Sequence, residues 1–290
     1  MAKKISIRLS THNINGYKEE YLNSRCNDNL NSILCIQEHW LRPTHKKYRS
    51  INQLRTVHPL FDGYGVSAMR GTHFNKVSSG RGYGGTGFVY NKQFVPFLRP
   101  VVRYENDRMT VMEIKDEKGP ILIINVYCPF KQSGDEHKVL YLETLGLIEN
   151  VLESNPSARY IVVGDFNYNI FDVRQQMSVA INELLSKYDM ICTHDLDTSF
   201  SVDNSFTRCC EKSNSYTLLD FIFVSRSMRD CVKSCRIHYD GGSPSDHFPV
   251  EMELEVVPQL TGVLSGSMSA RGSNARGSNA VNWSFLTGRF

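Results

Sequence analysis

The sequence predicts an α/β protein built as one large domain, and three observations support this prediction. Short apolar runs rich in β-branched residues alternate with polar turns through most of the chain. Apolar residues recur at helical spacing in two longer segments, at about 136–154 and 175–187. Apolar residues make up 41% of the 290 positions, which is enough for a sizeable core. We therefore expect mixed strands and helices over residues 1–257.

The composition of the chain indicates which classes of protein are compatible with the sequence. The formal net charge is only +3, from 33 Lys and Arg against 30 Asp and Glu, so any basic surface for nucleic acid must be local. Eight cysteines include no Cys-x-x-Cys pair, and several lie inside apolar runs, which predicts reduced thiols in an intracellular protein. No segment approaches the ~20 apolar residues of a membrane helix. We expect a soluble, unsecreted protein with no membrane partner.

The N-terminal half predicts six strands and one surface helix. Ile5, Ile7 and Leu9 alternate with polar residues, which is the period of a strand with one buried face. A polar stretch at about 18–32 predicts the helix, and residues 69–87, rich in Gly, Ser and Arg, predict a mobile loop. Five further strands are predicted at 33–36, 86–91, 95–104, 108–114 and 120–126.

The C-terminal half begins with the helix at about 136–154, which closes at an Asn-Pro pair and leads into a strand at 160–163. Residues 205–207 and 216–224 predict two arms of a hairpin whose polar loop, 208–215, is unusually long. Residues 250–257 predict the last strand. From 258 to 290 a near-repeat of Arg-Gly-Ser-Asn-Ala offers little to bury, which predicts a flexible linker toward a further module.

A polar motif follows the strand at 160–163. Gly164 is followed by Asp165, Phe166 and Asn167, so a carboxylate and an amide two residues apart point the same way at a strand end. The carboxylate can orient or deprotonate a water, and the amide can donate to a phosphate oxygen. A tight turn explains these residues equally well. Four other polar clusters at the ends of apolar runs favour a catalytic site.

Two of these clusters offer groups suited to phosphate chemistry. Glu38 follows the strand at 33–36 and is a candidate ligand for Mg²⁺, although an exposed strand-end charge is the commoner explanation for such a residue alone. Tyr127 ends the strand at 120–126 and can donate to a phosphate oxygen, or it can be a buried structural tyrosine. His12 and His39 are interpreted as structural histidines.

Six motifs in a fixed order resemble the endonuclease/exonuclease/phosphatase superfamily, which includes deoxyribonuclease I and the apurinic/apyrimidinic endonucleases. They are Asn13-Ile14-Asn15-Gly16, Gln37-Glu38, Tyr127-Cys128-Pro129, Gly164-Asp165-Phe166-Asn167, Leu219-Asp220 and Ser245-Asp246-His247. The resemblance runs from residue 4 to about 257. It implies a four-layer sandwich of two mixed β-sheets flanked by helices, which the strand and helix pattern allows.

Within this superfamily the chain is similar to the endonuclease domain of a non-LTR (LINE-type) retrotransposon. Four features carry the similarity: the motif Gly-Asp-Phe-Asn, the run Glu38-His39-Trp40, the long hairpin before Asp220 and the linker at 258–290. It implies a double-stranded DNA target that is nicked to leave a 3′-OH primer for reverse transcription. It also implies a C-terminal reverse transcriptase, synthesis in the cytoplasm and action in the nucleus. The oligomeric state is left open.

The resemblance also implies roles for particular residues. Glu38 would bind one Mg²⁺ or Mn²⁺, with Asp246 as a second metal residue and Asn13 beside them. Asp165 would activate the attacking water, and Asn167 and Tyr127 would hold the phosphate. His247, oriented by Asp220, would stabilise the charge on the phosphoryl group, which follows the general logic of a carboxylate and imidazole pair. The residues expected to contact substrate are Thr207, Arg208, Lys212 and Ser245.

Two alternatives remain from the sequence alone. Another phosphodiesterase of the same superfamily, such as an apurinic repair endonuclease, a deadenylase or a lipid phosphodiesterase, would share these residues and differ in its loops. A non-catalytic DNA-binding domain is the second alternative, and the intact set of acids and amides argues against it.

Overall fold

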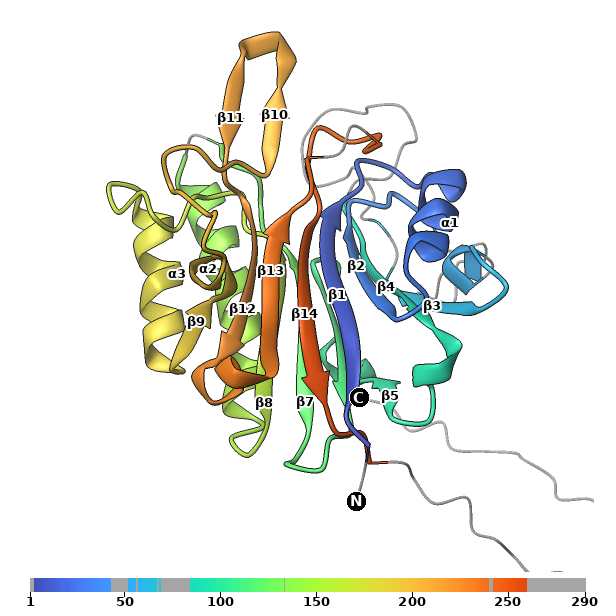
Figure 1. Cartoon of the computed structure of the whole chain (residues 1–290). Coiled ribbons are helices and arrows are strands. Elements are labelled where there is room, and N and C mark those ends of the chain that lie inside the picture. The colour runs from blue at the N-terminus through green and yellow to red at the C-terminus, as the bar shows by residue number, and fades with distance from the viewer. Residues whose placement is uncertain are drawn as a thin grey trace, which may run out of the picture. The chain divides into compact units, whose positions relative to one another are not determined.

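Two six-stranded β-sheets lie face to face in the computed structural model (Figure 1). The structure describes residues 3–42, 52–55, 57–66, 68, 84–132, 134–239 and 242–259. The first sheet has the order β13-β14-β1-β2-β4-β3, and the second has the order β5-β6-β7-β8-β12-β9. Both sheets are mixed, because β1 pairs with β2, and β7 with β8, in parallel, while the other neighbours are antiparallel.

The strand bounds follow the sheet order. The first sheet contains β13 (Val232–Ile237), β14 (Val250–Val256), β1 (Ile5–Asn13), β2 (Ser32–Gln37), β4 (Thr86–Asn91) and β3 (Phe61–Gly65). The second contains β5 (Leu98–Pro100), β6 (Met109–Ile114), β7 (Ile121–Tyr127), β8 (Arg159–Asp165), β12 (Asp220–Ser225) and β9 (Met190–Cys192). A separate two-stranded hairpin is formed by β10 (Arg208–Cys210) and β11 (Ser215–Thr217).

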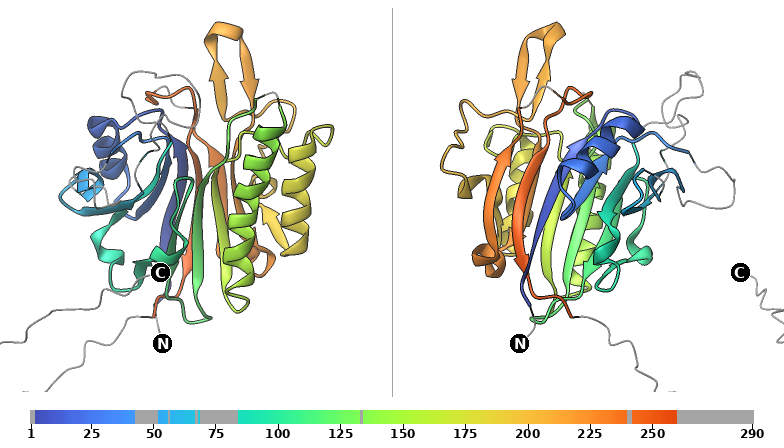
Figure 2. Two further views of the ribbon diagram at one scale, coloured as in Figure 1. Left: turned by 180° about the vertical axis from the view of Figure 1, so that it is seen from behind. Right: turned by 45° about the vertical axis from the view of Figure 1, so that its right-hand side comes forward.

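Helices cover the outer faces of both sheets (Figure 2). Helix α1 (Glu19–Asp28) packs on the first sheet through Leu22 and Cys26. Helices α2 (Asp135–Glu153) and α3 (Gln176–Lys187) pack on the second sheet. Short 3₁₀ helices lie at Asn52–Arg55, Lys92–Phe94, Val102–Tyr104, Thr193–Leu196, Glu211–Ser213 and Arg226–Cys231. The predicted fold class, a four-layer sandwich of two mixed sheets flanked by helices, is confirmed.

Strand β8 shows how the layers are held together. Tyr160 and Val162 face the helices of the second sheet, whereas Ile161 and Val163 face the first sheet. Successive strand residues point to opposite faces, so a strand buried on both faces requires a continuous apolar run. Full burial of one such Ile or Val stabilises the fold by roughly 1.5–3 kcal/mol. This run ends at Gly164, where the polar motif begins.

A buried polar network joins the two sheets below one of their edges. The Gln37 side-chain nitrogen donates to Asn125 Oδ1 at 2.7 Å and to Thr11 Oγ1 at 3.0 Å. The Asn125 amide nitrogen in turn donates to the backbone oxygens of Ile36 and Gly87, at 3.1 and 2.8 Å. Gln37, Asn125 and Thr11 are fully buried, where an unpaired polar group would cost about 1–3 kcal/mol. The network therefore favours one alignment of the sheets.

The edge strands depart from the sequence prediction. Strands β3, β9 and β13 were not predicted, and the predicted strand at 95–104 is wrong: only Leu98–Pro100 is a strand, between two 3₁₀ helices. All four are the outermost strands of their sheets. An edge strand has one neighbour and an open side, so it needs fewer apolar residues and tolerates proline. The apolar pattern is correspondingly weak there.

The hairpin also differs from its prediction. Residues 205–207 are not a strand, and 216–224 divide between β11 and β12, which belong to different sheets. The hairpin arms are instead Arg208–Cys210 and Ser215–Thr217, joined by a 3₁₀ turn that ends at Asn214 with φ +45°. Asparagine tolerates this left-handed conformation better than most residues. The segment predicted as a loop is therefore a short β-ribbon.

Several expectations fall partly or wholly outside the described residues. The predicted mobile loop at 69–87 overlaps them only from residue 84 onward, and the predicted linker only at 258 and 259. There Pro258 bridges Asp116, and the Gln259 N–H donates to the Lys115 carbonyl at 2.9 Å, so pairing extends two residues beyond the expected boundary at 257. All eight cysteines are free thiols. Among the described residues, no helix has the length and apolar character to cross a membrane.

His39 is a structural histidine, as the sequence suggested. Its side chain is fully buried, with Nε2 at 2.9 Å from the Val66 carbonyl oxygen and Nδ1 accepting the Leu41 N–H at 3.0 Å. These contacts require a neutral ring with the proton on Nε2. Burial lowers the pKa of His39 to about 4. The folded state therefore excludes a proton that the unfolded chain binds below its ordinary pKa of about 6.5.

The first prediction concerns stability in acid. Because the unfolded state binds more protons between pH 4 and 6.5, the contribution of His39 to the free energy of unfolding is complete above pH 6.5 and declines toward pH 4. His39→Gln removes this proton, so its free energy of unfolding should fall by about 2 kcal/mol less between pH 7 and pH 5 than that of the wild type. Urea titrations at both pH values measure the difference, and identical pH dependence in the two proteins would contradict it.

Candidate active site

Strand direction brings the polar motifs to one edge of the sandwich. Parallel strands β1 and β2 both end there, at Asn13 and Gln37, and β7 and β8 end at Tyr127 and Asp165. Strand β12 is antiparallel to β8, so its first residue lies at the same edge, with Asp220 opposite Asp165 in the register. The side chains of Asn13 and Asp165 hydrogen bond across the two sheets at 3.0 Å. Residues far apart in the chain thus share one edge of the sandwich, which is the candidate site.

Gly164 places Asp165 in this edge. A Cβ atom at Gly164 would lie 1.9 Å from the Val126 carbonyl oxygen, and its φ of +146° is rarely adopted by other residues. Only glycine fits this close approach to β7. Asp165 Oδ1 then accepts the Asn167 N–H at 2.9 Å, and Asn167 Nδ2 donates to Asp165 Oδ2 at 3.2 Å. The predicted turn and the predicted pairing of carboxylate and amide are therefore both present.

Contacts with other segments of the chain also hold the turn at residues 165–167. Asn167 has φ +54°, and its amide nitrogen also donates to the Cys128 carbonyl at 3.0 Å. The Tyr141 hydroxyl, on α2, donates to the Phe166 carbonyl at 2.6 Å. Phe166 itself is buried among the core residues of the second sheet. The amide of Asn167 is held beside Asp165 by these contacts.

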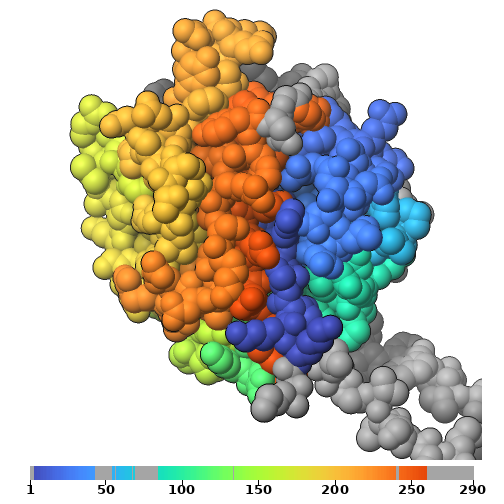
Figure 3. Space-filling view, viewed as in Figure 1, coloured from blue at the N-terminus to red at the C-terminus, as the bar shows by residue number. Residues whose placement is uncertain are grey.

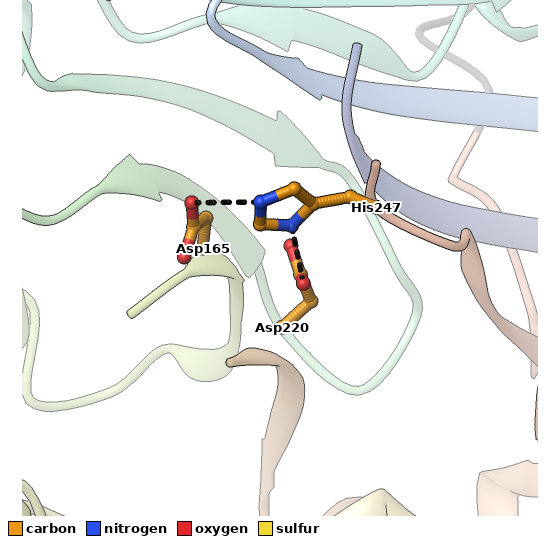
Figure 4. A group of neighbouring side chains, drawn as sticks. All are labelled: Asp165, Asp220 and His247. Atoms are coloured by element: carbon orange, nitrogen blue, oxygen red, sulfur yellow. Dashed lines mark hydrogen bonds and ion pairs between the residues drawn. The ribbon is translucent and has the colours of Figure 1, made fainter. Parts of the chain in front are cut away.

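His247 lies between two carboxylates (Figure 4). Its Nδ1 donates to Asp220 Oδ2 at 2.8 Å, and its Nε2 lies 4.0 Å from Asp165 Oδ2. Asp220 is fully buried, and its backbone N–H, like that of Leu219, donates to the Thr207 hydroxyl at 2.9 Å. The expected role of Thr207 in substrate contact does not fit, because its side chain is completely buried. Thr207 instead positions Asp220.

The two carboxylates and the imidazole shift one another's protonation. Burial alone would lower the pKa of His247, but the charges of Asp220 and Asp165 raise it to about 9. Burial and the charge of Asp220 raise the pKa of Asp165 to about 7, while His247 and Asn13 act in the opposite direction. At neutral to mildly alkaline pH, the site thus combines a charged imidazolium with a carboxylate that can take up a proton. These are the states required of an anion-stabilising group and a general base.

Glu38 forms the other half of the site. Asn13 Nδ2 donates to its Oε1 at 2.9 Å, and the Trp40 indole N–H donates to its Oε2 at 3.1 Å. Burial, together with the charges of Glu38 and Asp165, raises the pKa of Tyr127 well above its usual range. A partly exposed carboxylate surrounded by neutral donors is suited to Mg²⁺ or Mn²⁺, which prefer oxygen ligands and retain several waters.

A second group in the described part of the chain can also offer metal ligands. Asp165, Asp220 and His247 each present one ligand atom, all within 4.8 Å of one another. One oxygen of Asp220, Oδ1, is buried without a hydrogen-bond partner and could be satisfied by a cation. However, His247 must be neutral to bind a metal, and the two carboxylates favour its charged form. The described residues thus offer two places for a cation, the Glu38 carboxylate and the group of Asp165, Asp220 and His247.

The remaining predicted residues lie around the base of the hairpin. Arg208 donates to Asp246 Oδ2 at 2.8 Å, and Asn15 donates to Asp246 Oδ1 at 3.4 Å, so both carboxylate oxygens have partners. The Ser245 hydroxyl donates to the Asn13 carbonyl at 2.6 Å and accepts the His247 N–H at 3.1 Å. Ser245 thus ties β1 to the His247 segment. Lys212 is exposed at the hairpin tip. Metal binding by Asp246 and substrate contact by these residues stay predictions.

Three contributors to the site were not assigned from the sequence. Trp40 was noted only as part of a run, and Asn15 only as part of a motif, yet both donate to acids of the site. His12, interpreted as structural, holds the His247 segment: its Nε2 is 3.0 Å from the His247 carbonyl oxygen. A polar residue near a strand end was the available signal for each. Their partners lie far away in the chain, so only the fold identifies them.

Comparison with known proteins identifies the family of this chain. A family profile described as Endonuclease/Exonuclease/phosphatase family matches residues 10–247. A search of curated proteins finds no significant match. Among solved structures, the AP endonuclease LMAP from Leishmania major superposes with a TM-score of 0.68 at 15% identity, covering 86% of this chain and 87% of that one.

Two further structures share the fold. The Xenopus laevis APE2 catalytic domain gives a TM-score of 0.64 at 16% identity, covering 87% of this chain and 93% of its own. The endonuclease domain of TRAS1, a telomere-specific non-LTR retrotransposon, gives 0.58 at 15% identity, covering 86% and 98%. These identities establish the fold alone. The family profile spans most of the chain, including every residue of the catalytic edge, and the chain therefore belongs to the Endonuclease/Exonuclease/phosphatase family.

Proposed function

We propose that this protein is a divalent-metal-dependent DNA endonuclease that nicks double-stranded target DNA. The observation that carries the proposal is the position of His247, hydrogen bonded to Asp220 and facing Asp165, beside an amide donor and a metal-binding carboxylate. Phosphodiester hydrolysis requires a base for water and positive or donor groups around the phosphate oxygens. This edge supplies each of them.

Each residue of the candidate site has a separate role in hydrolysis. Asp165 takes a proton from the attacking water as the new P–O bond forms. Asn167 and the charged His247 stabilise the phosphoryl oxygens, and Asp220 keeps the imidazole oriented and protonated. Tyr127 donates to the phosphate. A Mg²⁺ or Mn²⁺ ion held by Glu38 would supply Lewis-acid stabilisation of the phosphate charge. The P–O3′ bond breaks, the departing O3′ takes a proton from a solvent water, and Asp165 later releases its proton to solvent, which leaves a 3′-OH and a 5′-phosphate.

The nearby hairpin favours a DNA target. Strand β10 bridges to His247 through Arg208, so the hairpin starts at the catalytic residue itself. The ribbon stands out from the surface above this edge (Figure 3). A two-stranded β-ribbon fits the major groove, and Arg208 and Lys212 are suited to phosphate or base contacts. The positive charges offered to DNA are therefore those of the hairpin beside the site, which agrees with a net charge of only +3 for the whole chain.

We further propose that the nick primes reverse transcription, as in a non-LTR retrotransposon. The sequence resemblance and the fold shared with the TRAS1 endonuclease domain support this role. A reverse transcriptase beyond residue 290 would be the functional partner, and its substrate would be nuclear DNA. The main competitor is a repair endonuclease, because the AP endonuclease LMAP shares the fold with a TM-score of 0.68, above the 0.58 of the TRAS1 domain.

Plasmid nicking separates these functions. Supercoiled plasmid with Mg²⁺ should yield relaxed circles with 3′-OH and 5′-phosphate ends, and a chelator should stop the reaction. An enzyme of repair type would cleave a duplex with one abasic site far faster than the intact duplex. Failure to cleave either substrate, with DNA binding retained, would favour the non-catalytic alternative.

The second prediction concerns the catalytic residues. Asp165→Asn, Asn167→Ala and His247→Gln should each reduce the nicking rate by at least ~10²-fold, because each removes a base or a stabilising donor. Asp165→Asn should not lower thermal stability at pH 8, because burial already disfavours the ionised carboxylate of Asp165. Nicking rates and thermal unfolding curves measure both effects.

A matched control comes from the opposite end of the second sheet. Asp189 forms a surface ion pair with Arg226 beside the end of β12 that lies away from Asp220. Asp189→Asn makes the same chemical change as Asp165→Asn and should leave nicking unaltered. If folded Asp165→Asn protein retained the wild-type rate, the assignment of the general base would be wrong.

The third prediction concerns target choice. Replacing residues 208–215 with a short Asn-Gly turn should redistribute nick positions along a plasmid, because DNA shape and groove contacts near the cut would no longer be probed. Some loss of rate is expected, since Arg208 also contacts Asp246. Lys212→Ala is the milder variant, because Lys212 lies at the exposed tip. Primer extension maps the nicks, and unchanged maps for both variants would leave the hairpin without a role in target choice.

A further inference from the structure

Trp40 contacts the carboxylate that we assign to the divalent cation. Its indole N–H donates to Glu38 Oε2 at 3.1 Å, while Asn13 donates to the other oxygen, Oε1, at 2.9 Å. The two donors come from different segments of the chain and hold opposite ends of the carboxylate. Such a pair fixes both the position of the group and its rotation.

The backbone around these two residues has an unusual conformation. Glu38 has φ +53° and Trp40 has φ +55°, values that residues with side chains rarely adopt. Backbone hydrogen bonds maintain the turn: the Gly16 N–H donates to the Glu38 carbonyl at 2.7 Å, and the Trp40 N–H donates to the Gly84 carbonyl at 3.2 Å. Positive φ at two residues near an active site is a common mark of a functional constraint.

Glycine at position 16 makes room for the indole ring. A Cβ atom there would lie 2.5 Å from Cε3 and from Cζ3 of Trp40, so the ring packs directly on the Gly16 backbone. This packing sets the direction of the indole N–H. Gly16 follows Asn15, which donates to Asp246, so the ring rests on a segment that belongs to the site.

We propose that Trp40 is a positioning residue for the cation site, holding the Glu38 carboxylate in its metal-binding orientation. The inference rests on the metal assignment made in the proposed function. Residues that hydrogen bond to metal ligands orient them, and their loss typically weakens metal binding by 10–100-fold. A tryptophan N–H is a donor only and carries no charge, so it orients the carboxylate without competing with a cation for its charge.

The test is the affinity for Mn²⁺, followed by electron paramagnetic resonance of the free ion. Trp40→Phe keeps an aromatic ring over Gly16 but removes the N–H, and it should weaken Mn²⁺ binding about tenfold. Trp283→Phe is the matched control, since it makes the same change at the only other tryptophan, and it should leave the affinity unchanged. Thermal unfolding should confirm that both variants are folded.

Fluorescence provides a second readout. In the Trp283→Phe protein, Trp40 is the single tryptophan, and paramagnetic Mn²⁺ should quench its emission with the midpoint found by resonance. Unchanged Mn²⁺ affinity in folded Trp40→Phe, or an absence of quenching, would overturn the inference. If Trp40→Phe weakens Mn²⁺ binding and Mn²⁺ quenches Trp40, but the wild-type protein never cuts DNA, the proposed function is overturned and the role of Trp40 stands. If the wild-type protein nicks DNA normally but Trp40→Phe binds Mn²⁺ as tightly as the wild type, the role of Trp40 is overturned and the proposed function stands.

Discussion

The hydrogen bond between His247 and Asp220 is the interaction on which the site depends. It fixes the imidazole, and together with the charge of Asp165 it keeps the ring protonated despite full burial. The pKa of Asp165 is also raised, to about 7, by burial and by the charge of Asp220. Three groups that would titrate separately in water therefore act as one unit. Burying charged groups in this way lowers the stability of the fold, but it gives the groups the protonation states that the reaction requires.

The architecture of the sandwich creates this unit. Asp220 and Asp165 face each other because β12 runs antiparallel to β8, and Thr207 fixes the backbone at the start of β12. The network of Gln37 and Asn125 joins the sheets just beneath the catalytic edge. Displacement of one sheet along the other would break these buried hydrogen bonds, so the first sheet, which carries Asn13 and Glu38, stays in register with the second. The buried hydrogen bonds thus hold the two halves of the site in one arrangement.

The sequence predicted the central strands, and the polar residues that it singled out at their ends lie together at one edge, for a physical reason. Strands buried on both faces, such as β8, require continuous apolar runs that end abruptly in polar residues. Edge strands β3, β9 and β13 lack that requirement and went undetected. Residues whose partners are distant in the chain were equally hidden. Thr207 was expected to touch substrate, but its burial beneath Asp220 gives it a structural role, and the contact of Trp40 with Glu38 needed the unusual turn at residues 38–40.

We propose that two positive charges act at one edge of the sandwich, a cation on Glu38 and a protonated His247. The group of Asp165, Asp220 and His247 offers a competing place for the metal, and the two arrangements imply different chemistry. Anomalous diffraction from crystals soaked in Mn²⁺ distinguishes them directly. We expect an anomalous peak beside the Glu38 carboxylate, with the hydrogen bond from His247 to Asp220 unbroken. A peak coordinated by Asp165, Asp220 and a neutral His247 would contradict it.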